Sequence, residues 1–454
     1  MNVIRPIVNQ LLNRGDSRSL RAKRNIALSF VFLGTRMAAS FLAVPLTLHY
    51  LNPINYGIWL TINSLISWVI LLDFGLSNGL RNKFAEAIAK NDNNLAGIYV
   101  STTYAAITLI LIVSYSIFIG VNHFVDWSNL INAPSETSQE LRAVVFWIIT
   151  FFFCKLIFQL IGILLIADQR PAINNALSAV SDFLVLLVAY ILSRTLSPSL
   201  LKFSFWISLT SLIVPILASI YFFSNNYREF TPSFRKIRTS QLSELSNLGA
   251  QFLILNTAVI IIFSTDNLII SIALSPADVA PYNIAYKYFG IVSLLFGIIL
   301  TPFWSAYTDA YQRGELNWIR KTTNILIGVW ISLIALVIFM ICVSQYAYHF
   351  WIGDSIKIPL TLSIFMGVFV LISTWNNIFT FFINGISKIR LQMYASIFAA
   401  VTNIPLSIFF AKALSLGSAG VILGTCFSLL LGAVLTPIQY NKILANKATG
   451  IWNK

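Results

Sequence analysis

Three charged side chains lie inside long apolar stretches in the first half of the chain. Arg36 falls within LGTRMAAS, Lys155 within FFFCKLIFQ and Asp182 within SAVSDFL. A charge at the centre of a lipid bilayer costs at least about 2.5–3.5 kcal/mol, so such side chains normally face a cavity or a charged partner. Two cations and one acid leave positive charge in excess. This favours a cavity that binds an anionic group, with a purely structural Arg/Lys–Asp pair as the alternative.

Asp266 is an acid of the second half that also lies inside an apolar stretch. It is too far from the end of that stretch to reach water without a cavity or a partner. Two interpretations stay open, a structural salt bridge and a site for a coupling ion or proton, and Asp182 is the other candidate for such a site. Lys287, in the next apolar stretch, is shallow enough for its side chain to extend to the membrane surface.

Asp73 and Arg81 lie where the second apolar stretch ends, in LLDFGLSNGLRNK. Gly75 and Gly79 form a GxxxG pattern there, which is typical of close helix packing in membranes. Packing is the simpler interpretation of this segment. A gate on the cytoplasmic side, with Asp73 and Arg81 as its charged residues, is the alternative.

The composition requires lipid as the solvent for much of the protein surface. Of the 454 residues, 57% are hydrophobic and only 10% are charged, whereas about 25% of the residues of a soluble domain are charged. The net charge of +14 does not indicate nucleic-acid binding, because most charges lie in short segments between apolar stretches. The three cysteines lie in apolar stretches without a CxxC pattern, and no Walker A, GxSxG or HExxH pattern occurs. We therefore expect no disulfide, metal site, cofactor or enzymatic activity.

Apolar stretches that are long enough to cross a membrane as helices recur along the whole chain. Only helices and closed barrels satisfy the backbone in lipid, and these stretches lack the alternation of a barrel strand. We therefore predict an all-α integral membrane protein with about twelve transmembrane helices. The spans are expected at about 25–48, 56–79, 97–122, 143–167, 174–193, 203–224, 249–274, 284–306, 322–344, 360–384, 391–411 and 418–439.

The lysines and arginines orient these spans. With the N-terminus in the cytoplasm, 22 of the 30 lie in cytoplasmic segments, five lie on the other side, and Arg36, Lys155 and Lys287 lie within spans. This asymmetry follows the positive-inside rule and places both termini in the cytoplasm. The predicted parts are a basic N-terminal segment (1–24), a six-helix bundle (25–224), a cytoplasmic linker (225–248), a second six-helix bundle (249–440) and a cytoplasmic tail (441–454). The N-terminal segment is either an amphipathic helix on the membrane surface or a disordered basic arm.

A weak internal repeat supports the division into two halves. At a shift of 223 residues, residues 51–53 align with 274–276 and residues 90–94 align with 313–317, each pair without a gap. Two six-helix bundles of the same orientation, related by an axis along the membrane normal, are a recurrent transporter design. At this shift neither Arg36 nor Lys155 has a basic counterpart, so the predicted repeat is asymmetric in charge.

The stretch PLTLHYLNPINYGIWLTINSLISWVILLDFGLSNGLRNKFAEAIAKND (45–92) resembles the N-terminal repeat of the polysaccharide transporters. These belong to the multidrug/oligosaccharidyl-lipid/polysaccharide (MOP) flippase superfamily. The stretch STDNLIISIALSPADVAPYNIAYKYF (264–289) resembles the corresponding turn in the second half. With twelve spans, two bundles and a basic cytoplasmic face, the likeness covers nearly the whole chain and implies a MOP/MATE-like fold. These motifs are moderately specific to the family and poorly specific to the substrate.

The resemblance implies an O-antigen-type (Wzx-like) flippase of the bacterial inner membrane. Such a protein moves an undecaprenyl-diphosphate-linked oligosaccharide, a unit of lipopolysaccharide or a related surface polysaccharide, to the outer leaflet by alternating access. The family's cationic cavity carries over onto Arg36 and Lys155, with Lys287 as a third position. The implied partners are the lipid-linked oligosaccharide and membrane lipids, and H⁺ or Na⁺ and the polysaccharide polymerase machinery are further candidates.

Three alternatives to this function stay open. An ion-coupled multidrug exporter of the same superfamily predicts an acidic cavity. A lipid II-type flippase usually has two further C-terminal spans, and we expect none after the span at 418–439. A polysaccharide polymerase typically carries a long outer loop, whereas the longest outer segment expected here is residues 123–142.

Overall fold

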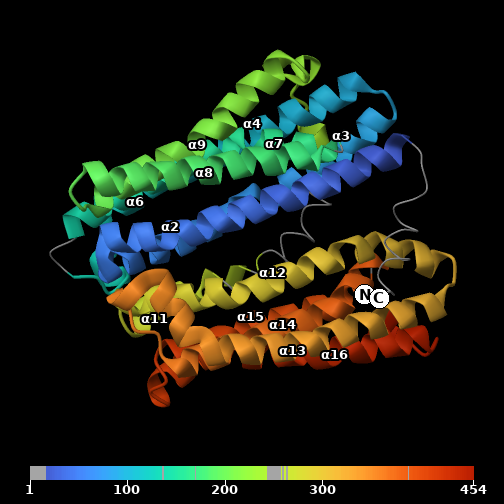
Figure 1. The fold of residues 1–454 in the computed structure, drawn as a ribbon. Coiled ribbons are helices and arrows are strands. Elements are labelled where there is room, and N and C mark those ends of the chain that lie inside the picture. The colour runs from blue at the N-terminus through green and yellow to red at the C-terminus, as the bar shows by residue number, and fades with distance from the viewer. Residues whose placement is uncertain are drawn as a thin grey trace. The chain divides into compact units, whose positions relative to one another are not determined.

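The fold is described from a computed structural model of the chain. The structure describes residues 17–134, 138–168, 170–242, 257, 260–261, 264–386 and 388–453. Every long element in these ranges is a helix, and they contain no strand (Figure 1). Residues 1–16, which carry the predicted surface helix, lie outside the described residues, and so do residues 249–256, 258–259 and 262–263 of the predicted span at 249–274.

The helices of the two halves follow one another along the chain with short connections. Those before residue 225 are α2 (Ser17–Val69), α3 (Leu76–Ala89), α4 (Asn93–Phe124), α5 (Trp127–Leu130), α6 (Ser138–Phe158), α7 (Leu160–Ala167), α8 (Pro171–Thr195) and α9 (Leu200–Ser224). Those after residue 265 are α11 (Asp266–Ala273), α12 (Pro276–Gln312), α13 (Leu316–Ile352), α14 (Leu360–Gly385), α15 (Arg390–Ile408) and α16 (Ser418–Leu444).

Ten helices in the described part are long and apolar enough to cross a membrane. The difference from the predicted twelve has two sources. First, α2 contains one non-helical residue, Asn52, with a φ of 64°, at the turn predicted between the first two spans. Second, the predicted span at 249–274 is described mainly from Asp266 onward. The chain is therefore a multi-pass α-helical membrane protein, as the sequence predicts.

The internal repeat is visible in the ends of the helices. The last residues of α3 and α12, and the first residues of α4 and α13, are separated by the same 223 residues. In the turns between them, Asn91 and Gly314 occupy equivalent positions and both have positive φ, 56° and 73°. Asn52 is likewise equivalent to Ser275, which lies between α11 and α12. These matching breaks agree with the predicted repeat of 223 residues. That the two halves have the same orientation stays a prediction.

The second predicted span is interrupted near its end. The helix stops at Val69, and a 3-10 turn leads to Gly75, which has a φ of 75° that other residues rarely adopt. The Asp73 carboxylate accepts hydrogen bonds from the backbone N–H of Ser77 at 3.1 Å and from its hydroxyl at 2.9 Å. These bonds begin α3 as a separate helix. Gly75 therefore forms a turn, and the GxxxG pattern does not lie along a single helix.

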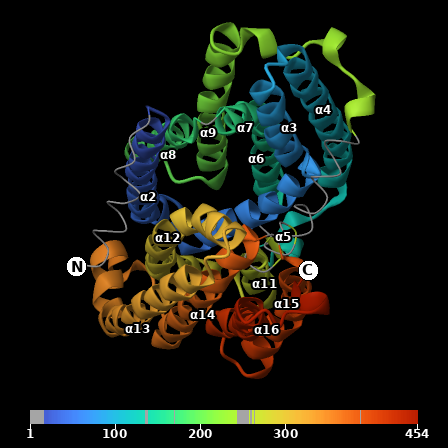
Figure 2. The same ribbon diagram turned by 90° about the vertical axis from the view of Figure 1, so that its right-hand side faces the viewer.

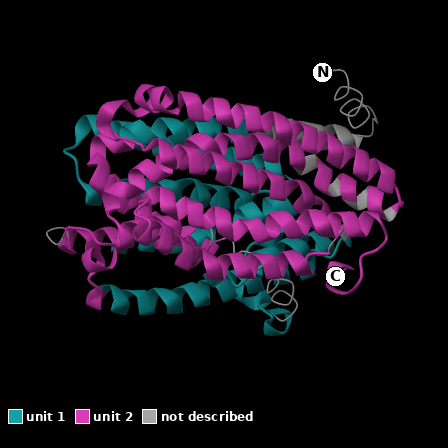
Figure 3. Ribbon diagram, turned by 90° about the horizontal axis from the view of Figure 1, so that it is seen from below, with its two compact units in different colours: residues 1–46, 72–122, 146–250 teal, residues 47–71, 123–145, 251–454 magenta. Residues whose placement is uncertain are grey.

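The described helices group into two compact units, coloured separately in Figure 3. Unit 1 consists of residues 1–46, 72–122 and 146–250, and unit 2 of residues 47–71, 123–145 and 251–454. Within unit 1, α8 packs on α9 and α3 packs on α7; within unit 2, α14 contacts α12, α13 and α16, and α15 packs on α16 (Figure 2). The predicted bundles, 25–224 and 249–440, differ from these units and stay a prediction.

Residues 47–71 group with unit 2 because they contact the start of its helices. Gly57 lies against the backbone of Pro276, and a Cβ atom on Gly57 would come within 1.7 Å of the Pro276 carbonyl oxygen. Nearby, the Asn267 side chain donates a hydrogen bond to the Ser64 hydroxyl at 2.7 Å. Glycine at position 57 therefore permits a close approach that any other residue would prevent.

The predicted linker is packed against unit 1 over the part that the structure describes. Phe230 makes an edge-to-face contact with Phe84 of α3, with the ring centroids 5.2 Å apart. The Ser233 backbone N–H donates to the Ser101 hydroxyl of α4 at 3.1 Å. Residues 225–242 therefore form part of the surface of unit 1.

Candidate functional site

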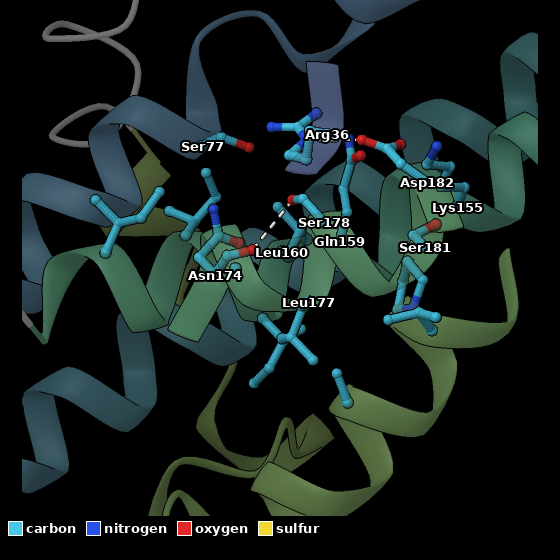
Figure 4. A pocket seen from close by; sticks show the side chains of 17 residues that line it. Arg36, Ser77, Lys155, Gln159, Leu160, Asn174, Leu177, Ser178, Ser181 and Asp182 are labelled. Atoms are coloured by element: carbon cyan, nitrogen blue, oxygen red, sulfur yellow. Dashed lines mark hydrogen bonds and ion pairs between the residues drawn. The ribbon is translucent and has the colours of Figure 1, made fainter. Parts of the chain in front are cut away.

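Unit 1 contains a cavity of about 450 Å³ that is lined by membrane-spanning helices (Figure 4). Side chains from α2, α3, α6, α7, α8 and α9 contribute to its wall. Its polar and charged lining residues are Arg36, Ser77, Lys155, Gln159, Asn174, Ser178, Ser181 and Asp182. The three charged residues singled out in the first half of the sequence thus line one cavity.

Arg36 and Asp182 form an ion pair across this cavity. The Arg36 Nε donates to the Asp182 Oδ2 at 2.7 Å, and the two side chains are 39% and 41% exposed. A guanidinium carries five N–H donors, and among the described residues Asp182 is the one acceptor recorded for Arg36. The remaining donors are available to an anion in the cavity.

Lys155 is the second cation of the cavity. Its side chain lies beside Asp182 in Figure 4, close enough to Asp182 and Arg36 to interact with both charges. Within the described part of the chain, the Lys155 side chain makes no ion pair and no hydrogen bond. The cavity therefore holds two cations and one carboxylate, with a formal charge of one positive unit in excess.

The wall of the cavity is broken where Lys155 and Gln159 lie. Gln159 separates α6 from α7, and the Gly162 N–H bonds to the Gln159 carbonyl at 2.9 Å in a tighter turn than an α-helix allows. The Phe158 carbonyl at this break accepts a hydrogen bond from the Ser219 hydroxyl of α9 at 2.9 Å. The backbone groups at this break therefore stay hydrogen-bonded, and the polar Gln159 side chain points toward the cavity.

Asn174 and Ser77 are lining residues that the sequence analysis missed. Asn174 lies against α7 at Gly162, where an added Cβ atom would meet the Asn174 Oδ1 at 2.3 Å. The sequence signal available for Asn174 was an amide pair in the first turns of an otherwise apolar helix. Ser77 lies in the segment that was interpreted as a packing motif.

Asp266 lies in unit 2, buried among α11, α12 and α16, with a 3% exposed surface. Its Oδ2 accepts hydrogen bonds from the Tyr282 hydroxyl and, at 3.5 Å, from the Thr425 hydroxyl. Its Oδ1 is buried and has no hydrogen-bond partner among the described residues, and the same holds for the Asn403 Oδ1. The Asn403 side chain donates to Thr425 at 2.9 Å, so the two unpaired oxygens belong to one polar cluster.

The structure describes no ion pair of Asp266 with a basic residue. Lys287 lies on α12 of the same unit, has an interaction of its own, and does not line the 450 Å³ cavity. Asp73 bonds to Ser77 and Arg81 is exposed, and the two form no ion pair in the described part of the chain. The roles predicted for Lys287, Asp73 and Arg81 stay predictions.

Comparison with known structures defines the class of fold. A structure described as the inward-facing conformation of a multidrug resistance MATE family transporter of the MOP superfamily matches with a TM-score of 0.75 and 14% identity, over 92% of this chain and 98% of that chain. A MOP superfamily transporter from Pyrococcus furiosus, described by a reverse polarity of its binding pocket that suggests a different function, matches with a TM-score of 0.59 and 15% identity, over 97% of this chain and 98% of that chain. The chain has the fold of the MATE transporters of the MOP superfamily.

Curated relatives indicate a narrower group of transporters that the chain resembles. The chain is 24% identical over 410 residues, 87% of this chain and 90% of the relative, to a Salmonella typhimurium protein named "Putative O-antigen transporter". It is 21% identical over 427 residues, 91% of this chain and 94% of the relative, to a Yersinia pseudotuberculosis protein named "Putative O-antigen export protein". No protein-family model matches the chain. The resemblance to the O-antigen transporters that the sequence motifs indicate is confirmed by these relatives.

Proposed function

We propose that this protein is a flippase for an undecaprenyl-diphosphate-linked oligosaccharide, a unit of O-antigen or a related surface polysaccharide. It would move this lipid from the inner to the outer leaflet of the bacterial inner membrane by alternating access, with both of its own termini in the cytoplasm. The observation that carries the proposal is the cavity of unit 1, in which Arg36 and Lys155 face a single carboxylate, Asp182. Relatives of similar length named for O-antigen transport support it.

The chemistry of the cargo matches that cavity. A diphosphate and the hydroxyl groups of a sugar cannot enter hydrocarbon without losing hydration that nothing there replaces. Arg36 replaces part of this hydration through paired hydrogen bonds to phosphate oxygens, and Lys155 does so as a point charge. The lipid tail stays outside, in the bilayer. A membrane potential that is negative inside drives an anion outward by about 2.3 kcal/mol per charge per 100 mV.

Coupling to a cation is a second part of the proposal. The buried Asp266 and Asn403 each have an oxygen without a partner in the described residues, and Thr425 links them. Oxygen ligands of this kind suit a proton or a hard cation such as Na⁺. We assign the coupling site to this cluster in preference to Asp182, because the Asp182 carboxylate already pairs with Arg36.

A multidrug exporter of the same superfamily is a weaker candidate. A site for cationic drugs requires negative charge, whereas the unit 1 cavity has positive charge in excess. The sign of this charge is the feature that separates the two functions.

Complementation of a deletion strain tests the proposed function. Arg36→Ala and Lys155→Ala are expected to abolish surface polysaccharide while the protein stays in the membrane at its usual level. Lys202→Ala is the matched control, since Lys202 is an exposed lysine of the same unit outside the cavity. Full complementation by both cavity variants would remove the basis of the proposal.

A further inference from the structure

Unit 2 contains a second cavity whose lining carries no formal charge. It has a volume of about 150 Å³ and lies among α14, α15 and α16. Its wall includes the side chains of Ser373, Asn376, Asn377, Thr380, Gln392 and Ser396. The cavity therefore presents amides and hydroxyl groups in helices that are long and apolar enough to span a membrane.

Packing between membrane helices explains only part of this polar wall. Polar side chains in such helices commonly bond across the helix interface, and the Thr436 hydroxyl does so by donating to the Asn376 Oδ1 at 3.0 Å. The side-chain amides of Asn377 and Gln392 make no such bond within the described residues, and the Gln392 Oε1 is shielded from solvent. An amide that only holds helices together would be paired.

Small residues keep the cavity open. A Cβ atom on Gly432 would come within 3.0 Å of the Asn376 side-chain nitrogen, so glycine there leaves the amide room beside α16. Ala395 and Ala399 of α15 line the same space. The side chains of Asn377 and Gln392 thus line this space, while the Gln392 Oε1 itself is covered by neighbouring atoms.

We propose that this cavity is a carbohydrate subsite that holds one uncharged sugar residue of the transported oligosaccharide. The inference rests on the proposed function and adds a second contact to it, distinct from the cationic cavity. Amides and hydroxyl groups both donate and accept, as sugar hydroxyl groups do. A diphosphate would find no cation in this wall, and a lipid tail would leave its polar groups unpaired, which is unfavourable. The volume is well below the roughly 300–1,000 Å³ of sites for larger ligands, so it suits a single ring.

The position of the cavity along the helices agrees with this assignment. Gln392 and Ser396 lie in the first two turns of α15, just after Lys388 and Arg390. The predicted orientation places these two basic residues in the cytoplasm. A sugar bound here would be held near the side from which a glycan made in the cytoplasm enters.

The test compares two ligands on the purified full-length protein in detergent. One is undecaprenyl diphosphate, and the other is the undecaprenyl-diphosphate-linked oligosaccharide extracted from the bacterium that makes this protein. Asn377→Leu and Gln392→Leu are each expected to lower the affinity for the glycan-bearing lipid by about tenfold, the effect of one hydrogen bond of ordinary strength. Their affinity for undecaprenyl diphosphate stays within about twofold of the wild type.

Two further variants make the test specific. Gly432→Ala places a Cβ atom 3.0 Å from the Asn376 side-chain nitrogen, which narrows the space beside this amide, and it is expected to lower the affinity for the glycan-bearing lipid alone. Asn441→Leu removes an exposed amide of α16 outside the cavity and should change neither affinity. Thermal unfolding of each variant identifies any that fail to fold. If both leucine variants fail to fold, the affinities of Gly432→Ala test the carbohydrate subsite.

The outcomes separate the two proposals. If the folded cavity variants bind both lipids as the wild type does, or lose affinity for both equally, the carbohydrate subsite is wrong. If the wild type binds the two lipids equally well, the subsite is wrong while the proposed function stands. If the wild type binds neither lipid, the proposed function itself fails.

Discussion

The ion pair of Arg36 with Asp182 allows the anion-binding role to be separated from a structural one. Both side chains are about 40% exposed, and an ion pair of this kind contributes at most about 1 kcal/mol. A charge-assisted hydrogen bond from Arg36 to a phosphate oxygen contributes about 1.5–3 kcal/mol, and a guanidinium can make two. On the proposed function, a diphosphate should therefore compete successfully with Asp182 for Arg36, and we expect Asp182 to hold the arginine in position until the ligand arrives.

Opposite effects follow for the two members of the pair. Arg36→Ala removes at least one charge-assisted bond and should weaken binding of undecaprenyl diphosphate by about 10- to 150-fold. Asp182→Asn removes the competitor and should strengthen binding by up to about fivefold. Arg36→Lys keeps the charge but loses the paired geometry, so its affinity should lie between those of Arg36→Ala and the wild type.

Isothermal titration of the purified variants with undecaprenyl diphosphate measures these affinities, with Lys202→Ala as the control. The wild-type affinity should also fall as the salt concentration rises, because part of the binding is electrostatic. A purely structural pair predicts a different pattern, in which both neutral variants lose thermal stability to the same degree and neither changes the affinity. Weakening of the same size for Asp182→Asn and Arg36→Ala would refute the anion-binding role.

Three further predictions address the rest of the molecule. Asp266→Asn should abolish the stimulation of transport by a proton or sodium gradient and leave ligand binding within about twofold; stimulation equal to that of the wild type would place coupling elsewhere. Gly57→Ala should destabilise the protein by about 1–3 kcal/mol or more, because its Cβ atom would overlap the Pro276 carbonyl oxygen, and its thermal unfolding is the measurement. The hydroxyl groups of Ser128 and Ser138 hold the pKa of the exposed Asp126 carboxyl below its ordinary value. The charged carboxylate therefore stabilises α5 fully at any pH above the ordinary pKa of an aspartate. This stabilisation is lost as the pH falls through the lowered pKa of Asp126. Hydrogen exchange of the α5 amides, corrected for intrinsic rates, should rise over that interval, and Asp126→Asn should show faster exchange already at neutral pH.

The helical architecture could be predicted from the sequence because lipid imposes simple requirements. Apolar length and charge placement reveal the spans, and the 223-residue shift locates equivalent turns such as those at Asn91 and Gly314. The break at Gly75 could not be seen in the same way, since Gly75 falls inside the predicted span at 56–79 and the turn depends on a local bond from Ser77 to Asp73.

The candidate site was predictable where its residues are anomalous by themselves. Arg36, Lys155 and Asp182 are conspicuous because a charge is expensive in lipid, and the structure places all three on one cavity. Asn403 and Thr425 are ordinary polar residues of apolar helices, and only the fold brings them to Asp266 from more than a hundred positions along the chain. Sequence reasoning therefore finds charges more readily than it finds the neutral groups that surround them.

Transport of the lipid-linked oligosaccharide into the outer leaflet of proteoliposomes tests the central claim most directly. The purified protein would be reconstituted, and the exposure of fluorescently labelled undecaprenyl-diphosphate-linked oligosaccharide on each leaflet would be followed over time. We predict rapid equilibration of the lipid with the wild type and with Lys202→Ala, and none above protein-free vesicles with Arg36→Ala. No transport by the wild type, or equal transport by Arg36→Ala, would contradict the account.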